Sequence, residues 1–264
     1  MRSDIVLLTD FGLADTYVGV MRGVILTINP QVHIVDLCHS IQPQDAFEGA
    51  LTLKCAYTYF PKRSIFVCVV DPEVGSKRKP ILVATKDYFF VAPDNGILTP
   101  IIDREKSCQI FEITNDRYFI KPVSHTFHGR DIFSPVAAYL SKGLLPSRFG
   151  PRLKSIKRLE LPIPVVNRKN RKIVGQVMHI DHFGNLITNI EERDLKGFSD
   201  RFHLNIKNSV IRGLCHSYVE VKRGSVLSII GSAGYLEISV NQGSAAKKLN
   251  VKKGERVEIS SEIG

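Results

Sequence analysis

The sequence contains no tryptophan, only three methionines and only five cysteines in 264 residues. The cysteines are odd in number and form no CxxC pair, so no disulfide framework is predicted. Cys55 and Cys68 lie in apolar runs and are expected to be small core residues. This usage is typical of a reducing compartment, and we expect a cytoplasmic protein.

Long apolar runs are also missing, and no segment approaches the length of a membrane span. The first apolar run, Ile5–Leu8, is too short for a signal peptide and is bracketed by Asp4 and Asp10. The chain is 44% hydrophobic and 23% charged, as is ordinary for a globular protein. Its length suits one large domain or two modest ones, without membrane association.

Acidic residues are in deficit, so the formal net charge is +10. Such a charge favours a polyanion or an anionic substrate as the ligand. The basic residues are scattered, however, and clusters such as 77–79 and 168–172 have no interleaved aromatic residues. Because a single-strand binder needs such aromatics, nucleic-acid binding is kept only as a disfavoured alternative.

Aspartates follow predicted strands at two places, the first being Ile65–Val70. This β-branched and aromatic run reads as a buried strand that ends at Asp71, because Pro72 cannot continue a ladder. The following loop contains Gly75 and carries Arg78. In open α/β sheets ligands bind beyond the carboxyl ends of strands, so this charged pair is predicted to face a substrate. The alternative is a surface ion pair that caps a turn.

The second place is the predicted strand Ile5–Thr9, which runs into Asp10 and then Asp15. Apolar residues at helical spacing predict a helix over Tyr17–Ile28, with Asp15 or Thr16 as its cap. An aspartate beside a helix N-terminus is a candidate ligand for ribose hydroxyls. A plain N-cap is the alternative function of that side chain.

Strands alternating with helices predict a layered α/β domain with a mostly parallel sheet over residues 1–165. The Pro-, Lys- and Arg-rich stretch 142–171 is interpreted as a linker, with the boundary near 165–170. Beyond it, short strands separated by Gly, Asn and Ser turns predict a smaller all-β domain of barrel or sandwich type over residues 166–264. The predicted strands of this domain are 175–180, 186–190, 202–206, 218–221, 225–230, 235–240 and 256–259.

The densest polar cluster of the chain spans His125–Asp131 and precedes a predicted helix over Ile132–Leu140. His125 and His128 are three residues apart, which raises the question of a metal site. A zinc site needs further ligands, and none stands at a suitable sequence distance. We therefore predict no metal, and a metal-dependent phosphoesterase remains an alternative function.

Seven segments together resemble one family over nearly the whole chain. They are LLTDFGLADTYVGVMRGVI, IVDLCHSIQPQD, VVDPEVGSKRKP, VAPDNGILT, TFHGRDIFSPVAA, HIDHFGNLITNI and GYLEISVNQGSAA. They are similar to the S-adenosylmethionine (SAM) hydroxide adenosyltransferases, hydrolases related to the fluorinases and chlorinases. The resemblance implies an α/β domain followed by a β-barrel-like domain. It also implies a homotrimer whose active sites lie between subunits.

The resemblance also implies roles for single residues. Asp71, Arg78 and His128 match the catalytic trio of the family. The residues that match its substrate pocket are Asp10, Asp15 for the ribose, Asp181 and Asn185 with Phe183 for the methionine end, Ser232 for the carboxylate, and Asn241 for adenine. The sequence departs from the motifs of the family at two positions. Glu73 stands where glycine is expected, and Ala233 replaces an arginine of the fluorinases.

The implied reaction is hydrolysis of SAM to adenosine and methionine by water that attacks the ribose 5′ carbon. A carboxylate at Asp71, where the halogenating relatives lack one, favours water over halide as the nucleophile. Neutral water attacks carbon poorly, so the trio is expected to activate it. No cofactor or metal is expected. A protein that binds SAM or adenosine without turnover is the remaining alternative.

Overall fold

The structure of the chain is a computed structural model that describes residues 3–198 and 201–260. The chain folds into two compact units, Met1–Glu160 and Leu161–Gly264. The first is an α/β unit and the second is built from antiparallel strands, as the sequence predicts. No helix in the described part is long and apolar enough to cross a membrane.

The first unit is organised around a seven-stranded sheet. Its four leading strands are parallel, and each later pairing is antiparallel. The spatial order is β2 (Ile34–Cys38), β1 (Ile5–Thr9), β3 (Ile65–Val69), β5 (Phe89–Pro93), β4 (Pro80–Thr85), β6 (Cys108–Glu112) and β7 (Arg152–Leu153). The helices are α1 (Tyr17–Ile28), α2 (Ala46–Ala56), α3 (Thr99–Arg104), α4 (Ser134–Ser141), a π-helical turn (Gly129–Phe133) and 3₁₀ turns at Tyr57–Tyr59, Asp116–Tyr118 and Pro146–Arg148.

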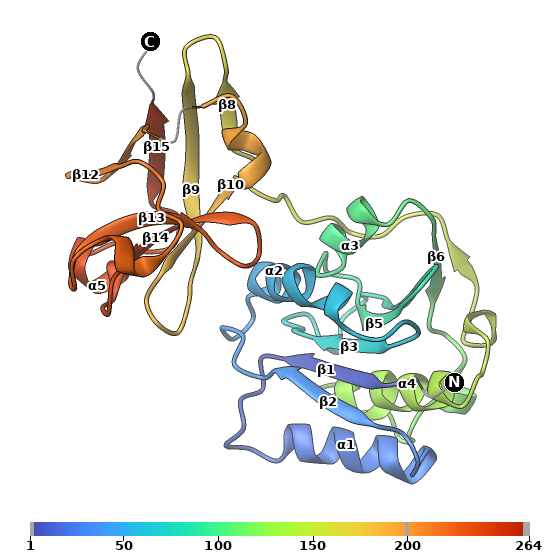
Figure 1. Cartoon of the computed structure of the whole chain (residues 1–264). Helices are drawn as coiled ribbons and strands as arrows, with labels where there is room; N and C mark the ends of the chain where they lie inside the picture. Colours follow the sequence, from blue (N-terminus) through green and yellow to red (C-terminus); the bar gives the residue numbers. More distant parts are fainter. Residues whose placement is uncertain (1–2, 199–200, 261–264) are drawn as a thin grey trace. The chain divides into compact units, whose positions relative to one another are not determined.

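The centre of the sheet is apolar on both faces, because helices cover each side. Every residue of β1 and β3 is buried, as expected for parallel strands between two helical layers. Ile5 and Leu7 pack with α1 and α4, whereas Val6 and Leu8 pack with α2 and α3. Figure 1 shows these two pairs of helices on opposite faces of the sheet. The carboxyl ends of β1 and β3 are thereby held side by side.

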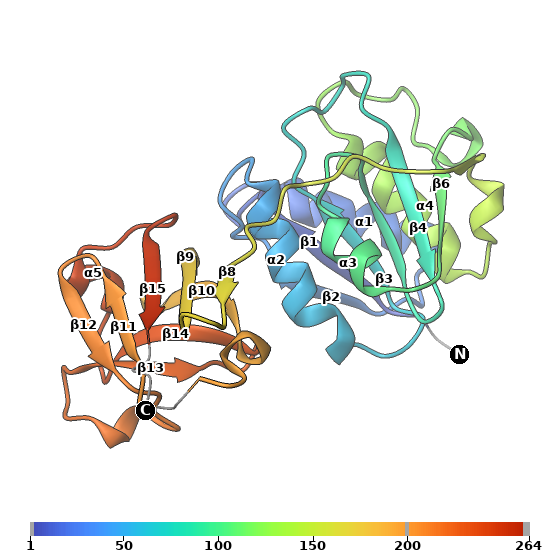
Figure 2. The same cartoon turned by 90° about the horizontal axis from the view of Figure 1, so that it is seen from above.

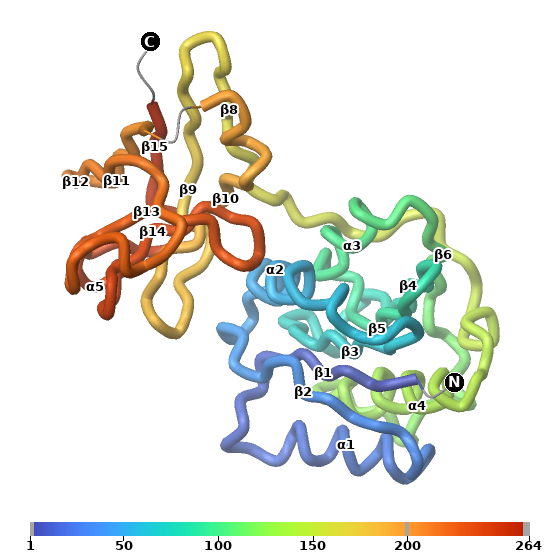
Figure 3. The backbone as a smooth tube through the Cα atoms, in the orientation of Figure 1, coloured from blue at the N-terminus to red at the C-terminus, as the bar shows by residue number. Residues whose placement is uncertain are grey.

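Several local predictions need correction. Thr16 precedes α1, but no side chain caps the helix. Strand β6 was not predicted. The stretch 142–160 is not a linker, because Phe149 is fully buried and β7 pairs with β6. After β7 the chain runs extended past α3 (Figure 3), where the backbone N–H of Leu159 donates to Thr99 Oγ1 at 2.9 Å.

The second unit is an eight-stranded antiparallel sheet that nearly closes on itself (Figure 2). A bridge from Cys215, beyond β12, to Ile229 in β13 brings the two ends of the sheet together. The interior is one apolar cluster. The elements are β8 (Val165–Asn167), β9 (Lys172–Ile180), β10 (Leu186–Glu191), β11 (His203–Ile206), β12 (Ser209–Arg212), β13 (Val226–Ile230), β14 (Tyr235–Val240), α5 (Ala245–Leu249), β15 (Arg256–Ser260) and a 3₁₀ turn at Glu192–Leu195.

Three predictions for this unit need correction. Residues 165–167, which fall in the predicted linker, form strand β8 and pair with β9. The predicted strand 218–221 is a 3₁₀ turn, Tyr218–Glu220, because Ser217 and Glu220 form a reciprocal capping box at its start. Strand β12 was not predicted, because its four residues show no clear alternation of apolar and polar types.

Candidate active site

Asp71 and Arg78 form a buried ion pair beyond the end of β3. Arg78 Nε donates to Asp71 Oδ1 at 3.0 Å, and Nη2 donates to Oδ2 at 2.5 Å. The two side chains are 1% (Arg78) and 4% (Asp71) exposed. Such a fork fixes both groups in one orientation. The alternative of a surface ion pair is excluded by this burial.

His128 joins the pair from the loop before the π-helical turn. Its Nδ1 lies 2.6 Å from Arg78 Nη2. Burial and then the Arg78 charge lower the pKa of His128 below its ordinary value of 6.5. Because a guanidinium only donates, Nδ1 is the acceptor, and the single proton of the neutral ring is on Nε2. The structure thus brings the three predicted catalytic residues into direct contact.

The turn that carries His128 is anchored by a residue that sequence reasoning did not single out. Asp131 is fully buried, accepts a hydrogen bond from the backbone N–H of Ser124 at 2.8 Å, and pairs with Arg130 at 2.6 Å. The ring of Phe133 lies 5.3 Å from the guanidinium carbon of Arg78. The polar cluster 125–131 was a signal for this anchor, but it did not show which acid would point inward.

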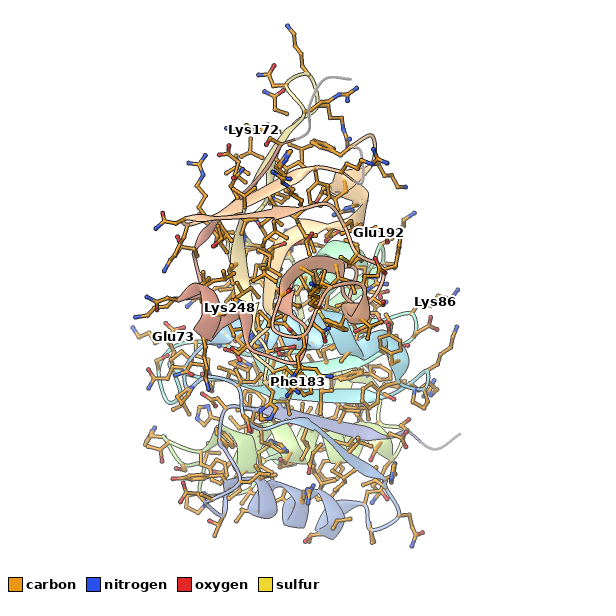
Figure 4. All side chains as sticks on the ribbon, turned by 60° about the vertical axis from the view of Figure 1, so that its left-hand side comes forward. Glu73, Lys86, Lys172, Phe183, Glu192 and Lys248 are labelled. Carbon is orange, nitrogen blue, oxygen red and sulfur yellow. The ribbon has the colours of Figure 1, made fainter. Side chains whose placement is uncertain are left out.

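Two close approaches hold the Asp71 loop against its neighbours. Gly75 has a φ of +77°, and a Cβ there would lie 2.2 Å from the carbonyl oxygen of His125. Asn95 Nδ2 donates to the carbonyl oxygen of Val70 at 2.7 Å. Gly75, and not Glu73, has the left-handed conformation. Glu73, labelled in Figure 4, therefore needs no glycine conformation, and it pairs with Lys157 at 2.9 Å.

The aspartates that follow β1 behave differently. Asp10 Oδ2 accepts a hydrogen bond from the backbone N–H of Gln44 at 2.8 Å, so it ties two loops together. Asp15 is exposed, and its carboxylate makes no hydrogen bond or ion pair with any residue in the described ranges. Asp15 is thus left available to a ligand.

In the second unit, the loop between β9 and β10 is held by Asp181. Its Oδ1 and Oδ2 accept from the backbone N–H and Nδ2 of Asn185, each at 2.8 Å. Gly184 approaches Ser244 so closely that a Cβ would lie 2.0 Å from Ser244 Oγ. Phe183 stands at the tip of this loop with 74% of its surface exposed (Figure 4).

The remaining predicted binding residues lie apart from that loop in the sequence. Ser232 and Ala233 are exposed in the turn between β13 and β14. Asn241 is buried, and its Nδ2 donates to the carbonyl oxygen of Val221 at 2.7 Å. Oδ1 of Asn241 takes no part in that contact and is suited to accept a hydrogen bond from a ligand, and Nδ2 keeps a second N–H.

The histidine pair that raised the question of a metal does not gather further ligands. His125 is exposed, whereas His128 contacts Arg78. Within residues 3–198 and 201–260, no three His, Cys, Asp or Glu side chains are grouped as a metal site requires.

Comparison with known proteins places this geometry in a family. Residues 5–150 match the SAM hydroxide adenosyltransferase N-terminal domain, and residues 175–258 match the C-terminal domain of the same family. The chain belongs to this family. The motif resemblance is confirmed, because the two matches together cover most of the chain.

Individual relatives agree with this assignment. A Methanocaldococcus jannaschii protein named (R)-S-adenosyl-L-methionine hydrolase is 37% identical and covers 98% of each chain. A Nocardia brasiliensis fluorinase is 27% identical, over 98% of this chain and 97% of its own. A crystal structure of an uncharacterized conserved protein from Thermotoga maritima has 41% identity and a TM-score of 0.92, over 97% of this chain and 100% of that one.

Proposed function

We propose that this chain hydrolyses SAM to adenosine and methionine, with water attacking the ribose 5′ carbon. The observation that carries the proposal is the buried contact of Asp71, Arg78 and His128 at the carboxyl end of a central parallel strand. Membership of the SAM hydroxide adenosyltransferase family supports the substrate.

The relatives' name specifies the (R) configuration of the sulfonium, and we extend that preference to this chain. The sulfur is a pyramidal stereocentre with three different carbon substituents. Inverting it exchanges the positions of the methyl group and the aminobutyryl chain when the adenosyl group stays fixed. A pocket that holds both adenosine and methionine ends therefore aligns the C5′–S bond with water for one epimer only.

The leaving group needs no acid, because a sulfonium departs as a neutral thioether. The nucleophile is the difficult part, and Asp71 supplies the proton acceptor for it. Both carboxylate oxygens contact Arg78, and each keeps a further lone pair for a water proton. As the C5′–O bond forms and the C5′–S bond breaks, the water gives one proton to Asp71, which later releases it to solvent.

His128 then has an orienting role. Since its Nδ1 accepts from Arg78, the neutral ring presents Nε2–H and donates to the water oxygen. Arg78 holds both partners in place, and burial together with its positive charge lowers the pKa of His128. A fixed water opposite the sulfur gains rate from orientation as well as from proton transfer.

Substrate binding is assigned to both units. Asp15 receives the ribose hydroxyls, and Asp10 shapes the same pocket through Gln44. In the second unit, the proposed contacts are Asp181, Asn185 and Phe183 at the methionine end, Ser232 at its carboxylate and Asn241 Oδ1 at adenine. With Ala233 in place of an arginine, the carboxylate contact rests on Ser232. We further propose a homotrimer with active sites between subunits, located in the cytoplasm.

The reaction as written uses no metal and no cofactor. We therefore expect the purified chain to keep its activity after dialysis against a strong chelator. Loss of activity that added divalent metal restores would contradict this metal-free reaction, and hydrolysis of a phosphate ester by the metal-loaded protein would instead favour the phosphoesterase alternative. Separate mass measurement of the native protein would test the trimer.

The decisive experiment incubates the chain with each sulfonium epimer of SAM in ¹⁸O-labelled water. We expect adenosine carrying one heavy oxygen, with methionine in equal amount and faster turnover of the (R) epimer. Unlabelled products would exclude attack by water at carbon. Tight binding of SAM without products would identify a binding protein instead of an enzyme.

A further inference from the structure

A buried hydroxyl lies beneath the loop that carries Asp15. Thr9 ends β1 and is completely buried. Its Oγ1 accepts a hydrogen bond from the backbone N–H of Phe11 at 3.2 Å. The same oxygen lies 2.8 Å from Nδ1 of His39. One threonine hydroxyl thus connects the start of the loop to a histidine thirty residues away in the sequence.

His39 holds the same loop a second time. The His39 side chain is buried. The backbone carbonyl oxygen of His39 accepts a hydrogen bond from the backbone N–H of Gly12 at 2.7 Å. Gly12 has a φ of +67°, so this bond fixes a left-handed turn. The backbone N–H groups of Phe11 and Gly12 are both tied, one through Thr9 and the other directly to His39.

The acid behind His39 fixes the tautomer. His39 Nε2 lies 3.0 Å from Asp36 Oδ1, although the contact is not aligned as a hydrogen bond, and Asp36 also pairs with Arg22. A carboxylate at that distance favours the proton on Nε2, which leaves Nδ1 as an acceptor. The Thr9 hydroxyl therefore donates to Nδ1, and its oxygen remains free to accept from Phe11.

We infer that Thr9, His39 and Asp36 form a network that holds the proposed ribose-binding loop Phe11–Asp15 in position. The inference depends on the proposed function, because it takes the ribose hydroxyls as the ligand of Asp15. The Asp15 carboxylate makes no hydrogen bond or ion pair with residues in the described part of the chain, and its backbone lies between this loop and the start of α1. Its position is consequently set through its backbone, which α1 holds on one side and Thr9 and His39 hold on the other. The hydrogen bonds and ion pairs of Thr9, His39 and Asp36 do not involve the trio.

The first test removes only the hydroxyl. Thr9→Val keeps the buried volume and loses both hydrogen bonds, whereas Thr9→Ser keeps the hydroxyl. We expect Thr9→Val to raise KM for SAM about tenfold, which corresponds to a loss of about 1.4 kcal/mol from the two hydrogen bonds together, with a smaller change in kcat. Thr9→Ser should restore KM. An equal loss in kcat at unchanged KM would overturn the inference.

Two substitutions of His39 separate its two ring nitrogens. Asparagine places an oxygen where Nδ1 stands and can still accept from Thr9, whereas glutamine reaches towards Asp36 and abandons Thr9. His39→Asn should therefore raise KM less than His39→Gln does. The reverse order would show that the contact with Asp36, and not the one with Thr9, sets the loop.

A double-mutant cycle with Asp15→Ala tests whether the network acts through Asp15. In that background, Thr9→Val should add little to KM, because the group being positioned is gone. Fully additive effects would overturn the inference, since they would mean that Thr9 acts elsewhere. Each variant is first compared with the wild type by thermal unfolding, so that general loss of structure is recognised.

A readout without substrate keeps this inference separate from the proposed function. Amide hydrogen exchange of Phe11 and Gly12 should accelerate in Thr9→Val and not in Thr9→Ser. If the wild type does not hydrolyse SAM, the proposed function and the ribose assignment fail together, whereas the exchange data still decide whether the network holds the loop. Unchanged exchange in Thr9→Val would overturn that part as well.

Discussion

The loops that follow β1 and β3 start from neighbouring positions, because Thr9 and Val69 are paired in the parallel sheet. Beyond that point, the aspartates Asp71 and Asp15 differ in burial and in hydrogen bonding. Asp71 is buried and held by two hydrogen bonds from Arg78. Asp15 is exposed, and the backbone before it is held instead.

This difference separates two chemical tasks. Burying a carboxylate and a guanidinium costs desolvation, which the fork of hydrogen bonds must offset. The result is a charged group whose geometry is fixed before substrate arrives, as transition-state stabilisation requires. An exposed carboxylate keeps its hydration until a ligand replaces the water. The first arrangement suits catalysis, and the second suits binding.

The largest expected effect comes from neutralising the buried acid. Asp71→Asn removes the proposed proton acceptor while keeping the shape of the side chain, so kcat should fall by about 10²–10⁴-fold. Steady-state kinetics measures the fall, and calorimetry checks that SAM still binds. Asp116→Asn is the matched control, because it alters an exposed ion pair with Lys121 and should leave kcat unchanged. Near-normal turnover in Asp71→Asn would contradict the assignment of catalysis to the buried aspartate and of binding to the exposed one.

The next effect is a pH dependence assigned to His128. Burial and Arg78 lower its pKa below 6.5, so the ring is neutral at pH 7 and becomes protonated only below 6.5. Protonation would turn Nδ1 into a donor facing the Arg78 donor, and kcat should therefore fall as pH decreases through that lowered pKa. This decrease of kcat at low pH, the acidic limb of the pH profile, should be absent from the residual activity of His128→Gln. The variant His39→Asn should keep it.

Stability must be followed in the same pH range. The pKa of His39 is also lowered, by burial and then by Arg22. Below pH 6.5, His39 and His128 bind protons more readily in the unfolded chain than in the folded state. The free energy of unfolding therefore decreases as pH falls. Activity is accordingly measured at a temperature well below the unfolding transition. An acidic limb that moved with His39→Asn would assign the effect to the β1 loop.

The contrast between the loops was only partly predictable from the sequence. A continuous apolar run predicted β1, which is buried on both faces, and helical spacing predicted α1, which buries one face; both have the predicted ends. Phe149 and the segment up to Glu160 were missed. Their order comes from contacts with α3 and β6, which have no period in the local sequence.

The candidate site shows the same limit. Motifs indicated Asp71, Arg78 and His128. The predicted strand that ends at Asp-Pro placed the first two beyond the carboxyl end of a strand. No pattern indicated that Thr9 and His39 would meet, because their contact depends on the pairing of β1 with β2. The roles of the second-unit residues rest on the family resemblance and stay predictions.

A smaller effect separates the two glycines of these loops. Gly12 has a φ of +67°, and a Cβ there would meet no atom of the described residues within 4 Å apart from its chain neighbours, whereas at Gly75 a Cβ would meet the His125 carbonyl oxygen. Gly12→Ala should cost about 1–2 kcal/mol from the left-handed backbone alone. Gly75→Ala should cost more, because the steric conflict adds to that strain. Denaturant unfolding compares them, and equal costs would contradict the packing of Gly75 on His125.

The smallest expected effect is at Glu73, in the loop after β3. Its partner is Lys157, and the two side chains are 46% (Glu73) and 55% (Lys157) exposed. Glu73→Gln should therefore change the free energy of unfolding by no more than about 1 kcal/mol and leave kcat unchanged. Glu73→Gly adds the backbone freedom of the unfolded chain, about 0.4–1 kcal/mol, again without effect on kcat. Lys157→Gln should match Glu73→Gln. If Glu73→Gly raised kcat where Glu73→Gln did not, the glycine of the family motif would set the shape of the Asp71 loop, and the fork with Arg78 and Gly75 would not be sufficient to do so.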